Sequence, residues 1–241
     1  MGLLHRDADF DHPALGALLA RLGVDRAVAV PRYPLPGSRQ GRCYWNVRDQ
    51  VRQQGGECVF GWMLVEIPGV ALFGWHHAVW RAPSGQLSDI SPHPVSGWGV
   101  GVTCFAVDPV QDHPLDWPPN LPQLFAPLLD ADPLDRFIAH EAEVHALRQR
   151  YRDAERAIPS ATCFDGERDL IVHVDTAADI ARLKKLERRY LPRIRAAEAR
   201  RDALIPALTR LQHEALERLA HAEVAGELAE DVLRGVGGIN L

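Results

Sequence analysis

Several features that would define a protein class are absent from this chain of 241 residues. No apolar run approaches the roughly 20 residues that a membrane-spanning helix needs. The first residues contain no basic segment followed by an apolar stretch, so no secretory signal is expected. We therefore expect a cytoplasmic protein that does not enter a membrane.

Lysine and cysteine are both rare. Only 2 of the 27 basic residues are lysines, and 32 acidic residues give the chain a net charge of -5. A chain with this charge is not expected to bind nucleic acid as a whole. The four cysteines are Cys43, Cys58, Cys104 and Cys163, and no two of them form a Cys-x-x-Cys pair. In a cytoplasmic chain of this size we expect free thiols rather than disulfides.

The residues that are present divide unevenly between two parts of the chain. Residues 1–130 hold all 6 tryptophans, 14 of the 18 prolines and 14 of the 19 glycines. They carry 21 acidic or basic residues, whereas residues 131–241 carry 38. Many turns and aromatic residues are typical of a compact α+β domain, and dense charge with few glycines is typical of long helices. We predict an α+β domain over 1–130, followed by a charged helical extension over 131–241.

Prolines and glycines divide the first part into short elements. Apolar runs predict strands between these breaks, and amphipathic spacing predicts short helices. The expected helices are 13–22, 43–53 and a short candidate at 121–129, and the expected strands are 59–67, 70–81, 87–91 and 100–107. A helix followed by a small antiparallel sheet belongs to the α+β class.

Apolar residues recur every three or four positions through the second part, which predicts long helices. We expect a helical hairpin or bundle with a short extended tip, made of helices at 137–158, 176–204 and 208–233 and a tip near 159–175.

The last two of these helices differ in charge. Residues 182–201 carry nine basic and two acidic residues, whereas residues 212–231 carry six acidic residues and one arginine. Helices of opposite charge are expected to pack together, within one chain or between the two chains of a homodimer. The basic helix could instead follow a phosphate backbone, but no aromatic platform interleaves with its arginines, so nucleic acid is the less favoured partner.

Cys43 is the residue that indicates chemistry. It lies where the helix of residues 43–53 is expected to begin, just after Gly41, which lets the backbone turn tightly. The free N–H groups and the dipole at a helix N-terminus favour a thiolate, the nucleophilic form of cysteine. His77 lies on the predicted strand 70–81, and Asp89 lies on the next strand. A thiol, an imidazole and a carboxylate suit a nucleophile, its base and the group that orients the base.

The length of the turn between the two strands decides whether His77 meets Asp89. If Ser84 and Gly85 form a two-residue turn, His77 pairs near residue 92, and Asp89 lies about three positions along the neighbouring strand. A bulge or a longer turn would bring Asp89 closer and decide which face its side chain occupies.

The order of these residues resembles the papain-like thiol peptidase superfamily, above all its small bacterial branches, which include cell-wall amidases. The resemblance covers about a fifth of the chain and is carried by Cys43, Asn46, Gly61-Trp62, His77-Ala78 and Asp89. It implies a papain-like core with Cys43 as nucleophile, His77 as general base and Asp89 as the residue that holds the imidazole tautomer. It also implies an oxyanion hole that includes the Cys43 N–H.

Two further residues are candidates for a second oxyanion donor. Papain-like enzymes often place a glutamine several residues before the cysteine, whereas Gln40 precedes Cys43 by only three positions. Asn46, one helical turn after Cys43, is either an alternative donor or an anchor for the preceding loop. The resemblance implies no cofactor, and it implies a protein or peptide substrate with an amide or thioester bond that the thiol attacks.

Two other interpretations compete with a thiol enzyme. His76, His77, Asp89 and His93 could supply nitrogen and oxygen ligands to zinc. Adjacent histidines on a strand point to opposite faces, so at most one of His76 and His77 could join such a site, and we predict no metal. The chain could also be a non-catalytic module whose charged helices bind a partner protein. A Cys43 sulfur within hydrogen-bond reach of His77, beside an open cleft, would favour the enzyme.

Overall fold

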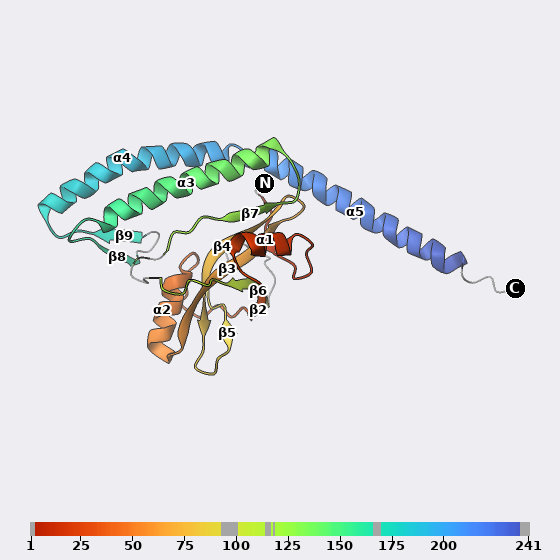
Figure 1. Ribbon diagram of the computed structural model, residues 1–241, viewed down its shortest axis with the longest axis horizontal. Helices are drawn as coiled ribbons and strands as arrows, with labels where there is room; N and C mark the ends of the chain where they lie inside the picture. Colours follow the sequence, from red (N-terminus) through yellow and green to blue (C-terminus); the bar gives the residue numbers. More distant parts are fainter. Residues whose placement is uncertain (1–2, 93–100, 114–116, 118, 166–169, 237–241) are drawn as a thin grey trace.

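The computed structural model describes residues 3–92, 101–113, 117, 119–165 and 170–236. An antiparallel sheet forms its centre, and a pair of long helices lies beside the sheet (Figure 1). The α+β class with a C-terminal helical hairpin, predicted from the sequence, is therefore confirmed. No helix among the described residues is both long and apolar enough to cross a membrane.

Seven strands form the main sheet. They are β1 (Arg6–Asp7), β2 (Val28–Pro31), β3 (Glu57–Ile67), β4 (Ala71–Arg81), β5 (Leu87–Ser88), β6 (Val102–Val107) and β7 (Leu124–Pro127). Five of them follow the spatial order β2-β6-β3-β4-β5, while β1 pairs with β3 and β7 pairs with β4. All of these pairs are antiparallel.

The hairpin of β3 and β4 is the centre of the sheet. Its strands pair along their whole length, from Glu57 with Arg81 to Ile67 with Ala71. One face of the hairpin packs against α1 (Leu15–Leu22), and the other packs against Leu134 and Leu208 at the starts of two long helices. Because both faces are covered, the two strands are near-continuous apolar runs, and this is why the sequence predicted them well.

The segment 121–129 was predicted as a short helix, and this prediction is wrong. Residues Leu124–Pro127 form β7, which pairs with Ala71 to Gly74 of β4. Phe125 stacks on Phe73 with 5.3 Å between ring centroids. Pro122 and Pro127 lack the N–H that a helix would need, so pairing with β4 prevails over the helical spacing of the leucines.

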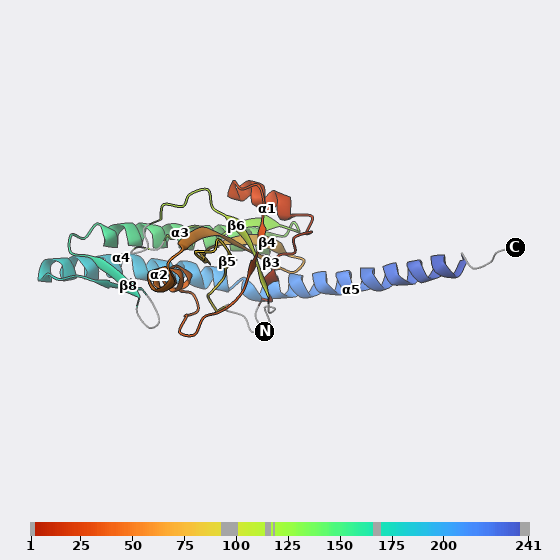
Figure 2. The same cartoon turned by 90° about the horizontal axis from the view of Figure 1, so that it is seen from below.

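Two antiparallel helices form an arm beside the sheet (Figures 1 and 2). The helical arm consists of α3 (Asp132–Arg156), α4 (Ala177–Asp202) and, between them, a small hairpin of β8 (Thr162–Asp165) and β9 (Leu170–His173). Its own apolar seam contains Val144, Leu147, Tyr190, Ile194 and Ala197. The extended tip predicted near 159–175 corresponds to β8 and β9.

The last helix, α5 (Ile205–Val236), runs away from the rest of the molecule (Figures 1 and 2). Its first turns pack against the sheet through Leu208 and Leu211. Beyond them, Leu219 is 49% exposed, although the hairpin or bundle expected from the sequence would cover such an apolar position of the helix 208–233. That part of the prediction is wrong, because α5 leaves the sheet after its first turns and has no neighbouring helix to cover this position in the described chain.

Within the described chain the basic helix α4 does not pack along the acidic helix α5, so the intrachain form of the predicted pairing is wrong, and the pairing between two chains stays a prediction. Arginines of α4 instead meet acids of α3: Arg200 lies 2.8 Å from Glu143, and Arg201 lies 2.9 Å from Glu141. The reason is topological, because an antiparallel hairpin sets the end of α4 beside the start of α3. The helix α5 begins at the end of α4 and continues outward, so it cannot lie along α4 (Figure 1).

Candidate active site

Cys43 is the first residue of α2 (Cys43–Gln54), where the sequence predicted a helix start. Gly41, two residues earlier, has a φ of 71°. This left-handed conformation turns the chain into the helix, and it would be strained for a residue with a side chain. Arg42 occupies the N-cap position without a side-chain hydrogen bond to the first turn, and that turn contains no acidic residue. The N–H groups at this helix end are therefore suited to stabilise negative charge at the Cys43 sulfur.

A gap in the strand pairing of β4 lies beside the start of α2. On the outer edge of β4, β7 pairs with residues 71–74 and β5 with residues 80–81, so no strand of the described chain pairs with residues 75–79 there. At this gap the Cys43 side chain is hydrogen-bonded to His77, and the Tyr44 hydroxyl lies 2.7 Å from Nδ1 of His76. The start of one helix thus reaches both faces of the strand, because adjacent strand residues point to opposite faces.

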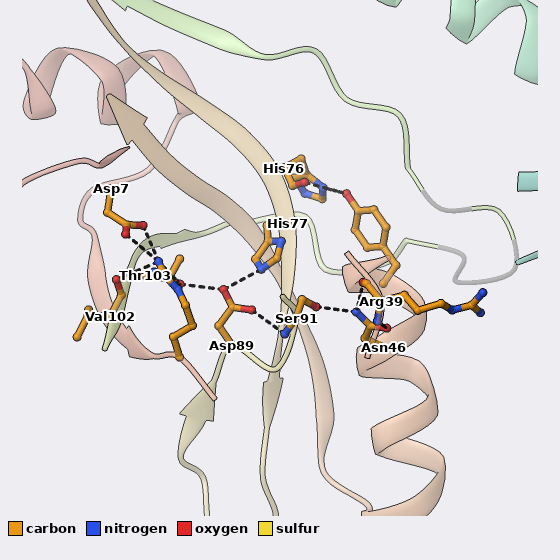
Figure 3. Close-up of polar contacts among 11 residues, drawn as sticks. Asp7, Arg39, Asn46, His76, His77, Asp89, Ser91, Val102 and Thr103 are labelled. Carbon is orange, nitrogen blue, oxygen red and sulfur yellow. Dashed lines mark hydrogen bonds and ion pairs between the residues drawn. The ribbon is translucent and has the colours of Figure 1, made fainter. Parts of the chain in front are cut away.

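Cys43, His77 and Asp89 form one continuous chain of contacts. The Cys43 and His77 side chains are hydrogen-bonded. On the other side of the ring, Nε2 of His77 lies 3.1 Å from Oδ2 of Asp89 (Figure 3). Because the carboxylate occupies Nε2, Nδ1 is the ring nitrogen left to face the thiol. The Asp89 side chain is fully buried and that of His77 is 10% exposed, so water hardly competes for their contact. The structure therefore brings together the three residues that the sequence singled out.

The turn between β4 and β5 explains how Asp89 reaches His77. Trp80 pairs with Ser88, which makes the connection one residue longer than the two-residue turn considered from the sequence. The predicted strand 87–91 is too long, because β5 ends at Ser88 and Asp89 forms a bridge with Arg32 instead. The longer turn and this change of partner carry the Asp89 carboxylate to the imidazole.

A network of buried polar groups holds the Asp89 carboxylate in place. The Thr103 hydroxyl donates to Oδ2 at 2.8 Å, and the Ser91 N–H donates to Oδ1 at 3.2 Å. Arg32 donates to Oγ1 of Thr103 at 3.2 Å and to both oxygens of Asp7 at 2.7 and 2.8 Å (Figure 3). Sequence reasoning missed Thr103 and Arg32, because they come near Asp89 only through the pairing of strands, whereas Ser91 bonds to Asp89 from two residues along the chain.

Opposing influences set the pKa of His77. Burial lowers it, because removal from water disfavours the charged imidazolium. The Asp89 carboxylate and the Cys43 sulfur outweigh burial and raise the pKa of His77 well above its ordinary 6.5. The direction of this shift favours the positively charged ring, which is the state that stabilises a thiolate beside it.

Cys43 and His77 both line a cleft of about 780 Å³. The start of α2 and the exposed Trp75 form one wall of this cleft. The helical arm forms the facing wall, with Arg152 from α3 and Arg195 from α4 among its lining residues. The geometry that would favour an enzyme, a thiol hydrogen-bonded to an imidazole beside an open cleft, is present.

Comparison with known proteins identifies no family. No protein-family model matches the chain, and searches of curated proteins and of solved structures found no match either. The resemblance to papain-like enzymes, noted in the sequence, therefore stays a prediction.

The two candidate oxyanion donors differ in their surroundings. Gln40 is exposed and lines the cleft. Asn46 accepts the N–H of Arg39 at 3.0 Å and donates to the Arg39 carbonyl at 2.8 Å and to Oγ of Ser91 at 3.0 Å (Figure 3). These contacts correspond to the anchoring role considered for Asn46, because they join the loop that carries Gln40 to helix α2.

The remaining cysteines differ from Cys43 in their contacts. Burial raises the pKa of Cys58 and of Cys104 to about 12 in each case, so both thiols are poor nucleophiles at neutral pH. Cys163 lies on the tip of the helical arm and lines the cleft, half-buried. Among the cysteines, the contacts with an imidazole and a helix start single out Cys43.

The zinc set considered from the sequence is not assembled in the described part of the chain. His93 lies outside the described residues, and His76 and His77 point to opposite faces of β4, as predicted. His77 and Asp89 belong to the thiol site described above. His76 instead meets residues that the sequence did not suggest.

Proposed function

We propose that this chain is a papain-like cysteine hydrolase or acyltransferase that attacks an amide or thioester bond. The observation that carries the proposal is the chain of contacts from Cys43 to His77 to Asp89, which begins at a helix N-terminus and opens onto a cleft. A thiol, a base and an orienting carboxylate in mutual contact are the requirements for nucleophilic catalysis by cysteine.

The first half-reaction makes an acyl-enzyme. The Cys43 thiolate attacks the carbonyl carbon, a C–S bond forms, and the carbonyl electrons move onto the oxygen. The N–H of Cys43 at the start of α2 stabilises this oxyanion. When the oxyanion collapses, the bond to the leaving group breaks and the His77 imidazolium gives its proton to the departing nitrogen or sulfur. Asp89 keeps Nε2 of the ring in place throughout.

The second half-reaction releases the acyl group. Water loses a proton to neutral His77 as its oxygen attacks the acyl carbon, and Cys43 departs as a thiolate beside the restored imidazolium. An amine in place of water follows the same steps and gives transfer rather than hydrolysis. Side chains that protein or peptide substrates would meet in the cleft include the apolar ring of Trp75 and the guanidinium of Arg195.

A second candidate function rests on α5. This helix projects away from the sheet and the helical arm, and Leu219 is exposed on it (Figure 1). A projecting helix of this kind can bind a partner protein through its apolar positions, with the α+β part acting as a scaffold. Such a module would not need an activated thiol, so the reactivity of Cys43 separates the two functions.

The test is the pH dependence of Cys43 alkylation by iodoacetamide, resolved by peptide mass spectrometry. In the wild type, Cys43 is expected to label rapidly well below pH 8, and His77→Ala is expected to slow it about 100-fold at pH 6 because the charged partner is gone. N-acetylcysteine, labelled under the same conditions, is the reference for an ordinary thiol. Slow labelling of Cys43 with the profile of that reference, unchanged in His77→Ala, would contradict the enzyme and favour the scaffold.

A further inference from the structure

A second cluster of titratable side chains lies on the other face of β4 from the thiol site. Nε2 of His76 lies 3.1 Å from Oδ2 of Asp108, and Nε2 of His113 lies 3.8 Å from the same oxygen. All three side chains are buried or nearly so, with exposed fractions of 2%, 8% and 12% in that order. The proposed acyl transfer uses none of them.

The hydrogen bonds of this cluster leave one position unfilled. Oδ1 of Asp108 accepts the Val110 N–H at 2.7 Å, which turns Oδ2 toward both imidazoles. Nε2 of His113 is buried and has no hydrogen-bond partner among the described residues. A buried imidazole nitrogen without a partner is costly, so a group bound at this position would be stabilising.

We propose that His76, Asp108 and His113 bind a divalent transition-metal ion of the zinc type through Nε2, Oδ2 and Nε2. The three ligand atoms lie within 4.8 Å of one another. This site differs from the zinc set weighed from the sequence, with which it shares only His76. It is also independent of the proposed acyl transfer, since it shares no residue with Cys43, His77 and Asp89.

The spacing of the ligand atoms suits a tetrahedral ion. Bonds of about 2.0–2.1 Å in a tetrahedral zinc site hold neighbouring ligand atoms roughly 3.3 Å apart. The separations of 3.1 and 3.8 Å around Oδ2 of Asp108 lie on either side of this value. The two imidazole rings lie with their centroids 5.2 Å apart and stand at 75° to each other, and their ligand atoms are no more than 4.8 Å apart. Three protein ligands leave the fourth position to water.

The donor set selects the metal. Two imidazoles and one carboxylate favour zinc and similar transition metals, whereas magnesium and calcium prefer oxygen ligands alone. The surroundings also resemble the outer shell of a metal site. The Tyr44 hydroxyl lies 2.7 Å from Nδ1 of His76, which fixes the ring with Nε2 toward Asp108. Phe60 and Trp62 each place a ring centroid 4.9 Å from one imidazole of the cluster.

The position of the site predicts what the ion does. His76 belongs to β4, Asp108 directly follows β6, and His113 lies five residues further along the chain. An ion would fasten this segment to the central hairpin. Through Tyr44 it would also fix the start of α2, next to the nucleophile. The role is that of a structural clamp, because the buried ligands give bulk solvent little access.

The test is zinc binding by the full chain. The protein is stripped with a chelator, incubated with Zn²⁺, passed through a desalting column and measured for bound metal. The wild type is expected to retain about one zinc per chain and to melt at a higher temperature with zinc than without it. His113→Gln is expected to lose both the bound zinc and the shift in melting temperature. His140→Gln, on α3, is the matched control for loss of a histidine and is expected to behave like the wild type.

A second pair of measurements separates this site from the thiol site, which could itself hold zinc. Cys43→Ala is expected to keep the bound zinc, and Co²⁺ bound to that variant is expected to give the visible absorption of a tetrahedral site without thiolate. If the wild type binds no more zinc than His113→Gln, or if Cys43→Ala loses the zinc, the proposal is wrong. Failure of zinc binding would leave Cys43 alkylation unaffected, so the two proposals can fail separately.

Discussion

His76 and His77 are neighbours on β4, and each places Nε2 3.1 Å from an aspartate oxygen. Their pKa values nevertheless move in opposite directions. Burial lowers both, and it prevails for His76, whose pKa falls to about 4 although Asp108 raises it. For His77 the raising influences prevail. The two rings differ in the group that each meets besides its aspartate: His76 faces the imidazole of His113, and His77 faces the sulfur of Cys43. An aspartate alone therefore does not decide the charge of a buried histidine.

The two aspartates also differ in what holds them. Asp89 is held by Thr103 and, through it, by Arg32, both of which belong to or directly follow strands of the sheet. Asp108 is held at Oδ1 by the N–H of Val110 in its own loop. Groups held by a sheet are rigid without further help, and this suits catalysis. The cluster around Asp108 depends on a loop, and this is where a bound ion would contribute most.

The largest expected effect is a loss of stability when the polar network that supports Asp89 is broken at Arg32. Arg32 has a side chain only 5% exposed, and it bonds both oxygens of Asp7. Arg32→Met leaves the Asp7 carboxylate without its partner and is expected to lower the free energy of unfolding by about 3–5 kcal/mol. Urea denaturation measures this change. Arg81→Met is the matched control, because its ion pair with Glu57 is exposed and its loss is expected to cost less than about 1 kcal/mol. Equal losses in the two variants would show that the network is not important for stability.

The next effect is on the charge of His77. Asp89→Asn removes the carboxylate that raises the pKa of His77, so the imidazolium is lost at a lower pH than in the wild type. The thiolate then lacks its counter-ion near neutral pH, and the alkylation rate of Cys43 at pH 6 is expected to fall about tenfold, or roughly 1.4 kcal/mol. Labelling profiles between pH 5 and 9 measure this shift. Glu57→Gln removes an exposed carboxylate from β3 and serves as the control. An unchanged profile in Asp89→Asn would mean that Asp89 does not act on the ring.

The smallest effect concerns the His76 side. Tyr44→Phe removes the hydroxyl beside Nδ1 of His76 and is expected to lower the free energy of unfolding by about 1 kcal/mol, because a buried hydrogen bond is lost. The labelling rate of Cys43 is expected to change far less than in Asp89→Asn, although Tyr44 is its neighbour in the chain. A larger effect of Tyr44→Phe on labelling would move the chemistry to the His76 side of β4.

The sequence predicted the parts of the fold that depend on local pattern. Such parts are the long apolar runs of β3 and β4 and the helix start at Cys43. They allowed Cys43 to be placed at a helix start and His77 on a strand before the structure was known. The short strands β1 and β2 were missed, because two to four residues contain no period.

The cluster at Asp108 shows why the rest could not be found from the sequence. Asp108 is 32 residues from His76, and the two meet because β6 pairs with β3, as in the pair of Gly61 with Val107. No local pattern fixes which strands become neighbours or in what register. Arg32 likewise lies outside the elements expected from the sequence; it meets Asp89 through a bridge between the two residues, and the pairing of β2 with β6 sets it beside Thr103.

The two walls of the cleft come from separate parts of the chain, so one wall can change in evolution while the other stays the same. The reactive groups belong to the sheet and α2, whereas the facing wall belongs to the helical arm, which has its own apolar seam. Substitutions such as those at Arg195 can alter which molecules fit without disturbing the thiol or its base. In the proposed hydrolase or acyltransferase, selectivity and reactivity could therefore evolve independently, and rebuilding the arm would be the way to redirect it.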